Sequence, residues 1–132
     1  VCVCVCVCVC VCVYVCVCVY EPLPAELAFH ANTAAEILQQ LNYDEAIILQ
    51  VGKLLRKENL KSDAEVQTLE DVACLVFLEH YLSEFSVSHN ETKLIDILRK
   101  TWRKMSSTGH SAASELQLDS HLNSLVEKAL TQ

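Results

Sequence analysis

Glycine is scarce in this chain, with two in 132 residues, and the scarcity excludes several enzyme classes. A phosphate-binding loop and the nucleophile elbow of serine hydrolases both need glycines at fixed spacing in a tight turn. Gly52 and Gly109 stand far apart and form neither pattern. We interpret Gly52, inside a helical pattern, as a mark of close helix contact.

Positive charge is also in short supply. Lysine and arginine together number 10 against 17 acidic residues, and every charge lies after residue 20, so residues 21–132 carry the whole net charge of −7. Broad nucleic-acid binding needs a basic footprint that displaces counterions. We therefore expect no broad nucleic-acid binding, while a local anion site remains open.

Cysteine is nearly absent outside residues 1–20, which hold eight of the nine. Their alternate spacing fits no disulfide framework or zinc module, and the histidines share no ligand spacing. Cys74 lies in an apolar helical pattern, where a nucleophile is not expected. One such thiol without a framework indicates a reducing compartment, and we predict a cytoplasmic location.

Residues 1–20 contain only Val, Cys and Tyr, in the order VCVCVCVCVCVCVYVCVCVY. Alternating G and T in DNA translate into this repeat, so we predict a low-complexity segment derived from a microsatellite. The length would suit a membrane span, but Glu21 follows directly and no basic flank orients it. A genuine span is not favoured, and the repeat would promote aggregation.

The only methionine is Met105, so no initiator residue is present. We interpret residues 21–132 as the C-terminal part of a helical domain whose N-terminal half is replaced by the repeat. Such a truncation predicts exposed apolar surface on the first helix and on the central helix.

Apolar residues recur at helical spacing over residues 25–41, 45–58, 63–86, 91–105 and 120–130, and no strand pattern exists outside the repeat. The sequence therefore predicts an all-α fold of about five helices.

Local signals refine the helix ends. Asp44 is an expected N-cap, and Ser62 with Glu65 forms an expected capping box. We expect a turn over residues 106–109.

The stretch Leu69–Tyr81 is the predicted centre of the domain, because every residue from Val72 to Leu78 is apolar and should be covered on all sides. Glu70 and Asp71 directly precede this run. A buried Asp71 needs a partner, and the sequence leaves open a metal, a His, an Arg or a structural ion pair.

Two basic clusters end the second and fourth expected helices: Lys53, Arg56, Lys57 and Lys61, then Arg99, Lys100, Arg103 and Lys104. They are typical of a solvated face near a helix C-terminus, or of an anion clamp.

The residues Lys104–Ser107 read KMSS, which resembles part of the K-M-S-K-S loop of class I aminoacyl-tRNA synthetases. That loop works beside a nucleotide-binding α/β domain and an H-I-G-H motif, and this sequence has neither. We interpret KMSS as a chance match or as a helix terminus.

The strings LRKENLKSDAEVQTLEDVACLVFLEHYLSEF and KLIDILRKTWRKMSSTGH resemble an uncharacterised all-α family catalogued as domain of unknown function 4202. The resemblance runs from about Leu27 to Lys128. Members of that family carry an upstream half with an H-x-x-H-C element, which this chain lacks. Some members are loosely labelled glutamyl-tRNA synthetase, a label that these residues do not support.

A fainter resemblance links the layout to HD-superfamily metal-dependent phosphohydrolases. It implies that His30 and Asp71 are metal ligands with Glu70 behind them, and that Lys57 and Arg103 contact phosphate. The other ligands would belong to the missing half. A hydrolytic metal needs more ligands than these two, so we predict that this chain is inactive, while intact relatives use a divalent metal.

The competing interpretation is a non-catalytic helical interaction module. In that interpretation, the basic face around Trp102 would meet an acidic partner.

Overall fold

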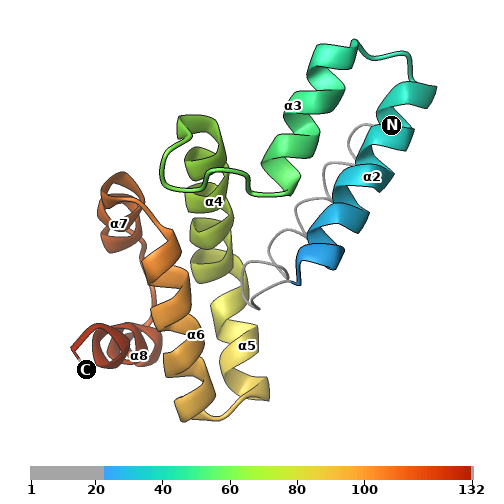
Figure 1. Cartoon of the computed structure of the whole chain (residues 1–132). Coiled ribbons are helices and arrows are strands. Elements are labelled where there is room, and N and C mark those ends of the chain that lie inside the picture. Colours follow the sequence, from blue (N-terminus) through green and yellow to red (C-terminus); the bar gives the residue numbers. More distant parts are fainter. Residues whose placement is uncertain (1–22, 132) are drawn as a thin grey trace. The chain divides into compact units, whose positions relative to one another are not determined.

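The computed structural model describes residues 23–131, which contain helices and turns and no strand (Figure 1). The helices are α2 (Pro24–Gln40), α3 (Glu45–Leu55), α4 (Ala64–Val76), the π-helix η1 (Phe77–Tyr81), α5 (Leu82–Ser88), α6 (Glu91–Lys104), α7 (Ser107–Ser114) and α8 (Ser120–Thr131). The all-α prediction is confirmed, and the predictions for residues 1–20 fall outside the described residues. The described residues belong to two compact units. The first lies within Glu21–Leu69 and the second within Glu70–Gln132.

In the first unit, α2 and α3 form a helical hairpin. Pro24 occupies the first turn of α2, where its missing N–H costs nothing. The helix is closed by Asn42, two residues after its last residue, whose φ of 56° is left-handed. Asn42 N donates to the Gln39 carbonyl and Tyr43 N to the Leu38 carbonyl, each at 3.0 Å. This is the Schellman closure of a helix, and it turns the chain into α3.

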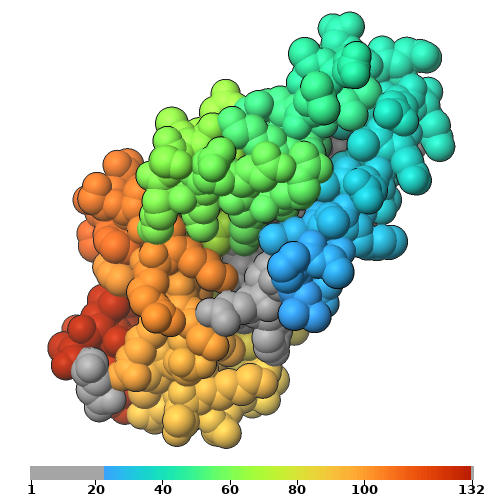
Figure 2. Space-filling model, in the orientation of Figure 1, coloured from blue at the N-terminus to red at the C-terminus, as the bar shows by residue number. Residues whose placement is uncertain are grey.

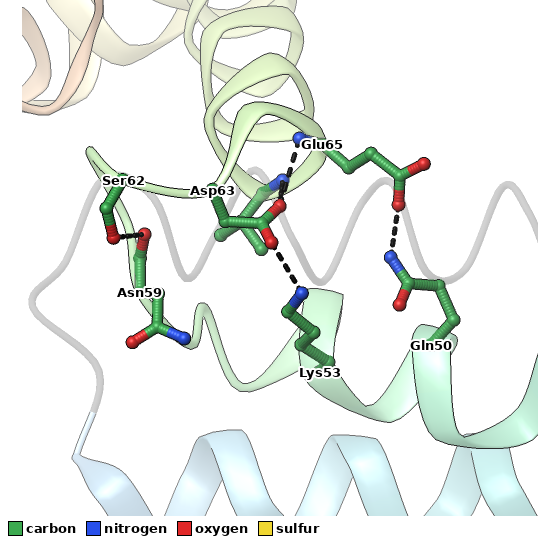
Figure 3. Close-up of polar contacts among 7 residues, drawn as sticks. Gln50, Lys53, Asn59, Ser62, Asp63 and Glu65 are labelled. Carbon is green, nitrogen blue, oxygen red and sulfur yellow. Dashed lines mark hydrogen bonds and ion pairs between the residues drawn. The ribbon is translucent and has the colours of Figure 1, made fainter.

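Asp63 is the N-cap residue directly before α4. Its Oδ1 accepts hydrogen bonds from Glu65 N at 3.0 Å and from Val66 N at 3.1 Å (Figure 3). Lys53 Nζ lies 2.5 Å from Asp63 Oδ2, and this hydrogen bond lowers the pKa of the Asp63 carboxyl. The expected capping box of Ser62 and Glu65 is therefore wrong. Ser62 Oγ instead donates to the Asn59 carbonyl at 3.0 Å, because the neighbouring carboxylate takes the cap.

The second unit contains the main apolar core. It joins the rod α4–η1–α5 to α6 and α8 through buried side chains that share helical spacing: Cys74, Phe77, Leu78, Leu82, Leu94, Ile97, Leu98, Met105, Leu122, Leu125 and Ala129. Arg99 Nε donates to the Ala129 carbonyl at 3.0 Å and so satisfies the C-terminal end of α8. Lys128 and Glu91 add an ion pair at 2.7 Å between α8 and α6.

The expected helix over residues 63–86 contains one π-helical turn, which the sequence pattern did not predict. Leu82 N donates to the Phe77 carbonyl, five residues back. The extra residue changes the rotation of α5 about the helix axis relative to α4. Leu82 then lies in the core with no exposed surface. The expectation that every residue from Val72 to Leu78 is covered on all sides is wrong. Val72 is 49% exposed, and Leu75 and Val76 are only partly buried, so one side of the rod remains accessible.

No helix in residues 23–131 is both long enough and apolar enough to cross a membrane.

Thr101 on α6 is buried at 2% exposure, and its Oγ1 has no hydrogen-bond partner among the described residues. A buried hydroxyl without a partner costs free energy that a methyl group of the same shape does not. We expect Thr101→Val to raise the free energy of unfolding by about 1 kcal/mol in urea titrations. Thr101→Ser is the matched control, since it keeps the hydroxyl and should destabilise by about 1 kcal/mol through the lost methyl. A lower free energy of unfolding in Thr101→Val would show that the Thr101 hydroxyl makes a stabilising hydrogen bond.

Candidate functional site

Asp71 contacts the N-terminus of α7. Its Oδ1 accepts the backbone N–H of Ser106 at 2.8 Å, and its Oδ2 accepts the Ser106 hydroxyl at 2.5 Å. Asp71 is buried at 9% exposure, near the middle of α4. The partner that a buried carboxylate requires is thus a helix end 35 residues later in the chain.

Gly109 completes this contact. Its N–H donates to Ser106 Oγ at 3.1 Å, which makes Ser106 the N-cap of α7. A Cβ at Gly109 would stand 2.8 Å from Asp71 Cγ and from Oδ1, so the carboxylate packs directly on the helix backbone. We call Asp71, Ser106 and Gly109 the α7 latch. A negative carboxylate is favoured there by the charge-assisted hydrogen bonds and by the positive end of the helix dipole.

A second contact holds α7 to the end of α6. The rings of Trp102 and His110 stack at 4.0 Å with an interplanar angle of 5°. His110 Nε2 also lies 2.8 Å from the Trp102 carbonyl oxygen. The two contacts together fix both the position and the rotation of a helix that has little apolar surface of its own.

The KMSS residues therefore form a helix terminus, as expected from the missing synthetase context. The expected turn over residues 106–109 is wrong, because α7 already begins at Ser107. Sequence reasoning missed the latch. Serine is a preferred N-cap residue, but nothing in the sequence connects Ser106 to Asp71.

His30 lies on α2 in the first unit, where its ring meets Phe29 edge to face at 5.7 Å. Asp71 and its neighbour Glu70, which has no exposed surface, belong to the second unit. Among residues 23–131 no three His, Cys, Asp or Glu side chains form a group suited to a metal ion. The metal-ligand roles of His30 and Asp71 and the supporting role of Glu70 remain predictions.

The two basic clusters are largely engaged in local structure. Lys53 pairs with Asp63, and Arg56 pairs with Glu58 at 2.6 Å. In the other cluster, Lys100 pairs with Asp96 at 3.2 Å. These contacts favour the structural interpretation of both clusters. Arg103 is exposed on α6, and its predicted contact with phosphate stays a prediction.

Lys57, the other predicted phosphate contact, closes α3. Its φ is 54°, its N–H donates to the Leu54 carbonyl at 3.1 Å, and Glu58 N donates to the Lys53 carbonyl at 3.2 Å. This is a second Schellman closure, at a position that favours glycine.

Replacing Lys57 tests which role dominates. We expect Lys57→Gly to stabilise the chain by about 0.5–1 kcal/mol, because the left-handed strain is relieved at some entropic cost. Lys57→Ala removes the same charge but keeps Cβ, so its stability should stay near that of the parent chain. Thermal unfolding measures both variants. Equal stability of the glycine and alanine variants would argue against backbone strain at this position.

Comparison with known proteins gives a family without an assigned activity. No curated protein and no solved structure matches the chain. One family model does match, over residues 25–126, which include α2 from its second residue, the whole rod α4–η1–α5, α6 and the three latch residues. The chain therefore belongs to the family described as Domain of unknown function (DUF4202).

Proposed function

We propose that this chain is a non-catalytic helical interaction module. The observation that supports this is the engagement of Asp71, whose two oxygens accept hydrogen bonds from Ser106 while Gly109 packs against its carboxyl carbon. A hydrolytic metal needs several ligands around one ion and an open position for water. The best ligand candidate of this chain instead holds a helix end, so its donor set does not fit such an ion.

The hairpin α2–α3 supplies the binding surface. Large apolar side chains remain exposed on it, among them Phe29 at 66% and Leu49 at 63%, and a shallow depression is lined partly by Tyr43, Ile48 and Leu49. Figure 2 shows surface atoms of both helices in blue to teal. Several such side chains on one element are typical of an interaction site. We define the hairpin surface as Phe29, Leu41, Tyr43, Ile47 and Leu49.

The partner that suits this surface best is a second copy of the chain. Exposed apolar side chains are stabilised by burial against another element, and two helical hairpins can pair into a four-helix arrangement. A twofold dimer uses the same surface on both copies, and apolar side chains are complementary to their own kind. An acidic partner is less suited, since three of the eight cluster residues already form ion pairs and Arg99 holds the end of α8.

Sedimentation of the full chain under reducing conditions tests this proposal. We expect a dimer whose dissociation constant rises at least tenfold in Leu49→Glu. Val87→Glu is the control, because Val87 is 89% exposed and lies on α5 in the other unit. A chain that stays monomeric at every concentration, or equal effects of the two variants, would refute the proposed dimer.

A second candidate concerns intact relatives. The adjacent buried carboxylates of Glu70 and Asp71 support it, because two such groups side by side are unusual in a purely apolar core. In such relatives the counterparts of His30 and Asp71 would bind a divalent metal, and those of Lys57 and Arg103 would contact the phosphate of the substrate. Metal analysis and a phosphatase screen on an intact relative test this. Loss of bound metal when the counterpart of Asp71 is changed to Asn would support it, and unchanged metal content would refute it.

A further inference from the structure

The segment Arg103–Ser106 places two cations three and two residues before a serine whose hydroxyl is half of the α7 latch. We propose that Ser106 is a phosphoacceptor for a protein kinase that reads basic residues, and that phosphorylation releases α7 from Asp71. The proposal does not rest on the dimer proposed above, since it concerns only residues of the second unit.

Charge and backbone both suit such a kinase. Arg103 is exposed, so an acidic kinase cleft can reach it, and complementary charge of this kind sets which partner is chosen. The helix α6 ends at Lys104, and the next residues are extended, with φ −73° and ψ 153° at Met105 and φ −82° and ψ 173° at Ser106. An extended phosphoacceptor is the form in which a kinase cleft aligns a hydroxyl with its nucleotide.

Access to Ser106 requires α7 to open locally, and the composition of α7 makes this opening less costly than global unfolding. Its sequence is STGHSAAS, and Gly109 is its only buried residue. The attachments identified above are polar or aromatic: the hydrogen bonds of Ser106 and the contact of His110 with Trp102. Segments with few buried apolar contacts open at a small fraction of the global unfolding free energy.

The chemistry of the product prevents the latch from closing again. The kinase transfers the γ-phosphoryl group of a nucleoside triphosphate to the serine. The Oγ–P bond forms, the bond from the γ-phosphorus to the bridging oxygen breaks, the nucleoside diphosphate leaves, and the hydroxyl proton passes to the kinase base. Ser106 thereby loses the donor that meets Asp71 Oδ2 at 2.5 Å and gains about 1.5–2 negative charges beside that carboxylate. Like charges at this distance repel, so the open form is favoured.

The test incubates the full chain with magnesium ATP and the catalytic domain of a basic-directed kinase. We expect one phosphate, located on Ser106 by fragmentation mass spectrometry, and a rate at least tenfold lower in Arg103→Gln, which keeps the latch residues. Hydrogen exchange across residues 107–114 should then accelerate at least tenfold in the phosphorylated chain, while exchange in α8 should not change. No incorporation, phosphate only on Ser107 or Thr108, an unchanged rate in Arg103→Gln, or unchanged exchange in α7 would each overturn the proposal.

Discussion

Asp71→Ala should lower the free energy of unfolding by about 3 kcal/mol. The change removes the acceptor of two hydrogen bonds from Ser106, and a hydrogen bond to a charged group contributes about 1.5–3 kcal/mol. It also leaves the N–H and hydroxyl of Ser106 without their partner in a half-buried site. Urea unfolding followed by circular dichroism measures the loss.

Asp71→Asn is the matched control, because the amide keeps the shape and one acceptor oxygen. It should cost about half as much, since the backbone N–H of Ser106 keeps its acceptor while the charge assistance is lost. A double-mutant cycle with Ser106→Ala should give a coupling of at least about 1 kcal/mol, as expected for residues in direct contact. A coupling energy near zero would show that the contact between the Ser106 hydroxyl and Asp71 contributes nothing to stability.

The same variants separate the latch from a metal site. If Asp71 were a ligand, a divalent cation would raise the thermal stability of the parent chain and leave Asp71→Ala unchanged. We expect the parent chain and the variant to respond alike to magnesium, manganese and zinc salts.

Helix positions could be predicted from the sequence because the apolar period and the end signals are local. Asp44 stands at a helix start where it was expected, and α6 agrees with its predicted range to within one residue. The π turn could not be predicted in this way. The π turn adds one residue to the helix, and Leu82 directly after it packs into the core. This packing depends on contacts with other helices, which the local apolar pattern does not describe.

The candidate site was predicted only in part, for the same physical reason. Burial of Asp71 follows from its place beside an apolar run, and so does its need for a partner. The identity of that partner depends on a contact across 35 residues, which the local pattern does not encode. The basic clusters were visible as charge, whereas their pairing with Asp63, Glu58 and Asp96 depends on how the chain turns back on itself.

Gly109→Ala should destabilise the chain by about 2 kcal/mol, although alanine is the better helix former. The added Cβ would stand 2.8 Å from Asp71 Cγ and Oδ1 and 3.1 Å from Oδ2. That carboxylate cannot withdraw without breaking its hydrogen bonds to Ser106. Overpacking of a fixed site costs up to about 3 kcal/mol, so a loss of about 2 kcal/mol remains after a helix-propensity gain of about 1 kcal/mol.

Gly52→Ala provides the control of opposite sign. The atoms nearest to a Cβ at Gly52 belong to the Arg56 side chain, with Nη1 at 3.0 Å. The close contact that we expected at Gly52 is therefore made by the C-cap residue of α3 itself. A flexible guanidinium can move aside, and the substitution should stabilise α3 by up to about 1 kcal/mol. If both glycine variants stabilise the chain, the close packing of Gly109 on Asp71 is wrong.

The decisive combination places Gly109→Ala in the Asp71→Ala background. Asp71→Ala removes the three atoms nearest to the new Cβ, so we expect the helix-propensity term to dominate. The substitution that costs about 2 kcal/mol in the parent chain should therefore gain up to about 1 kcal/mol in this background. Such a reversal of sign would show that the two positions are coupled, because independent sites would show the same loss in both backgrounds.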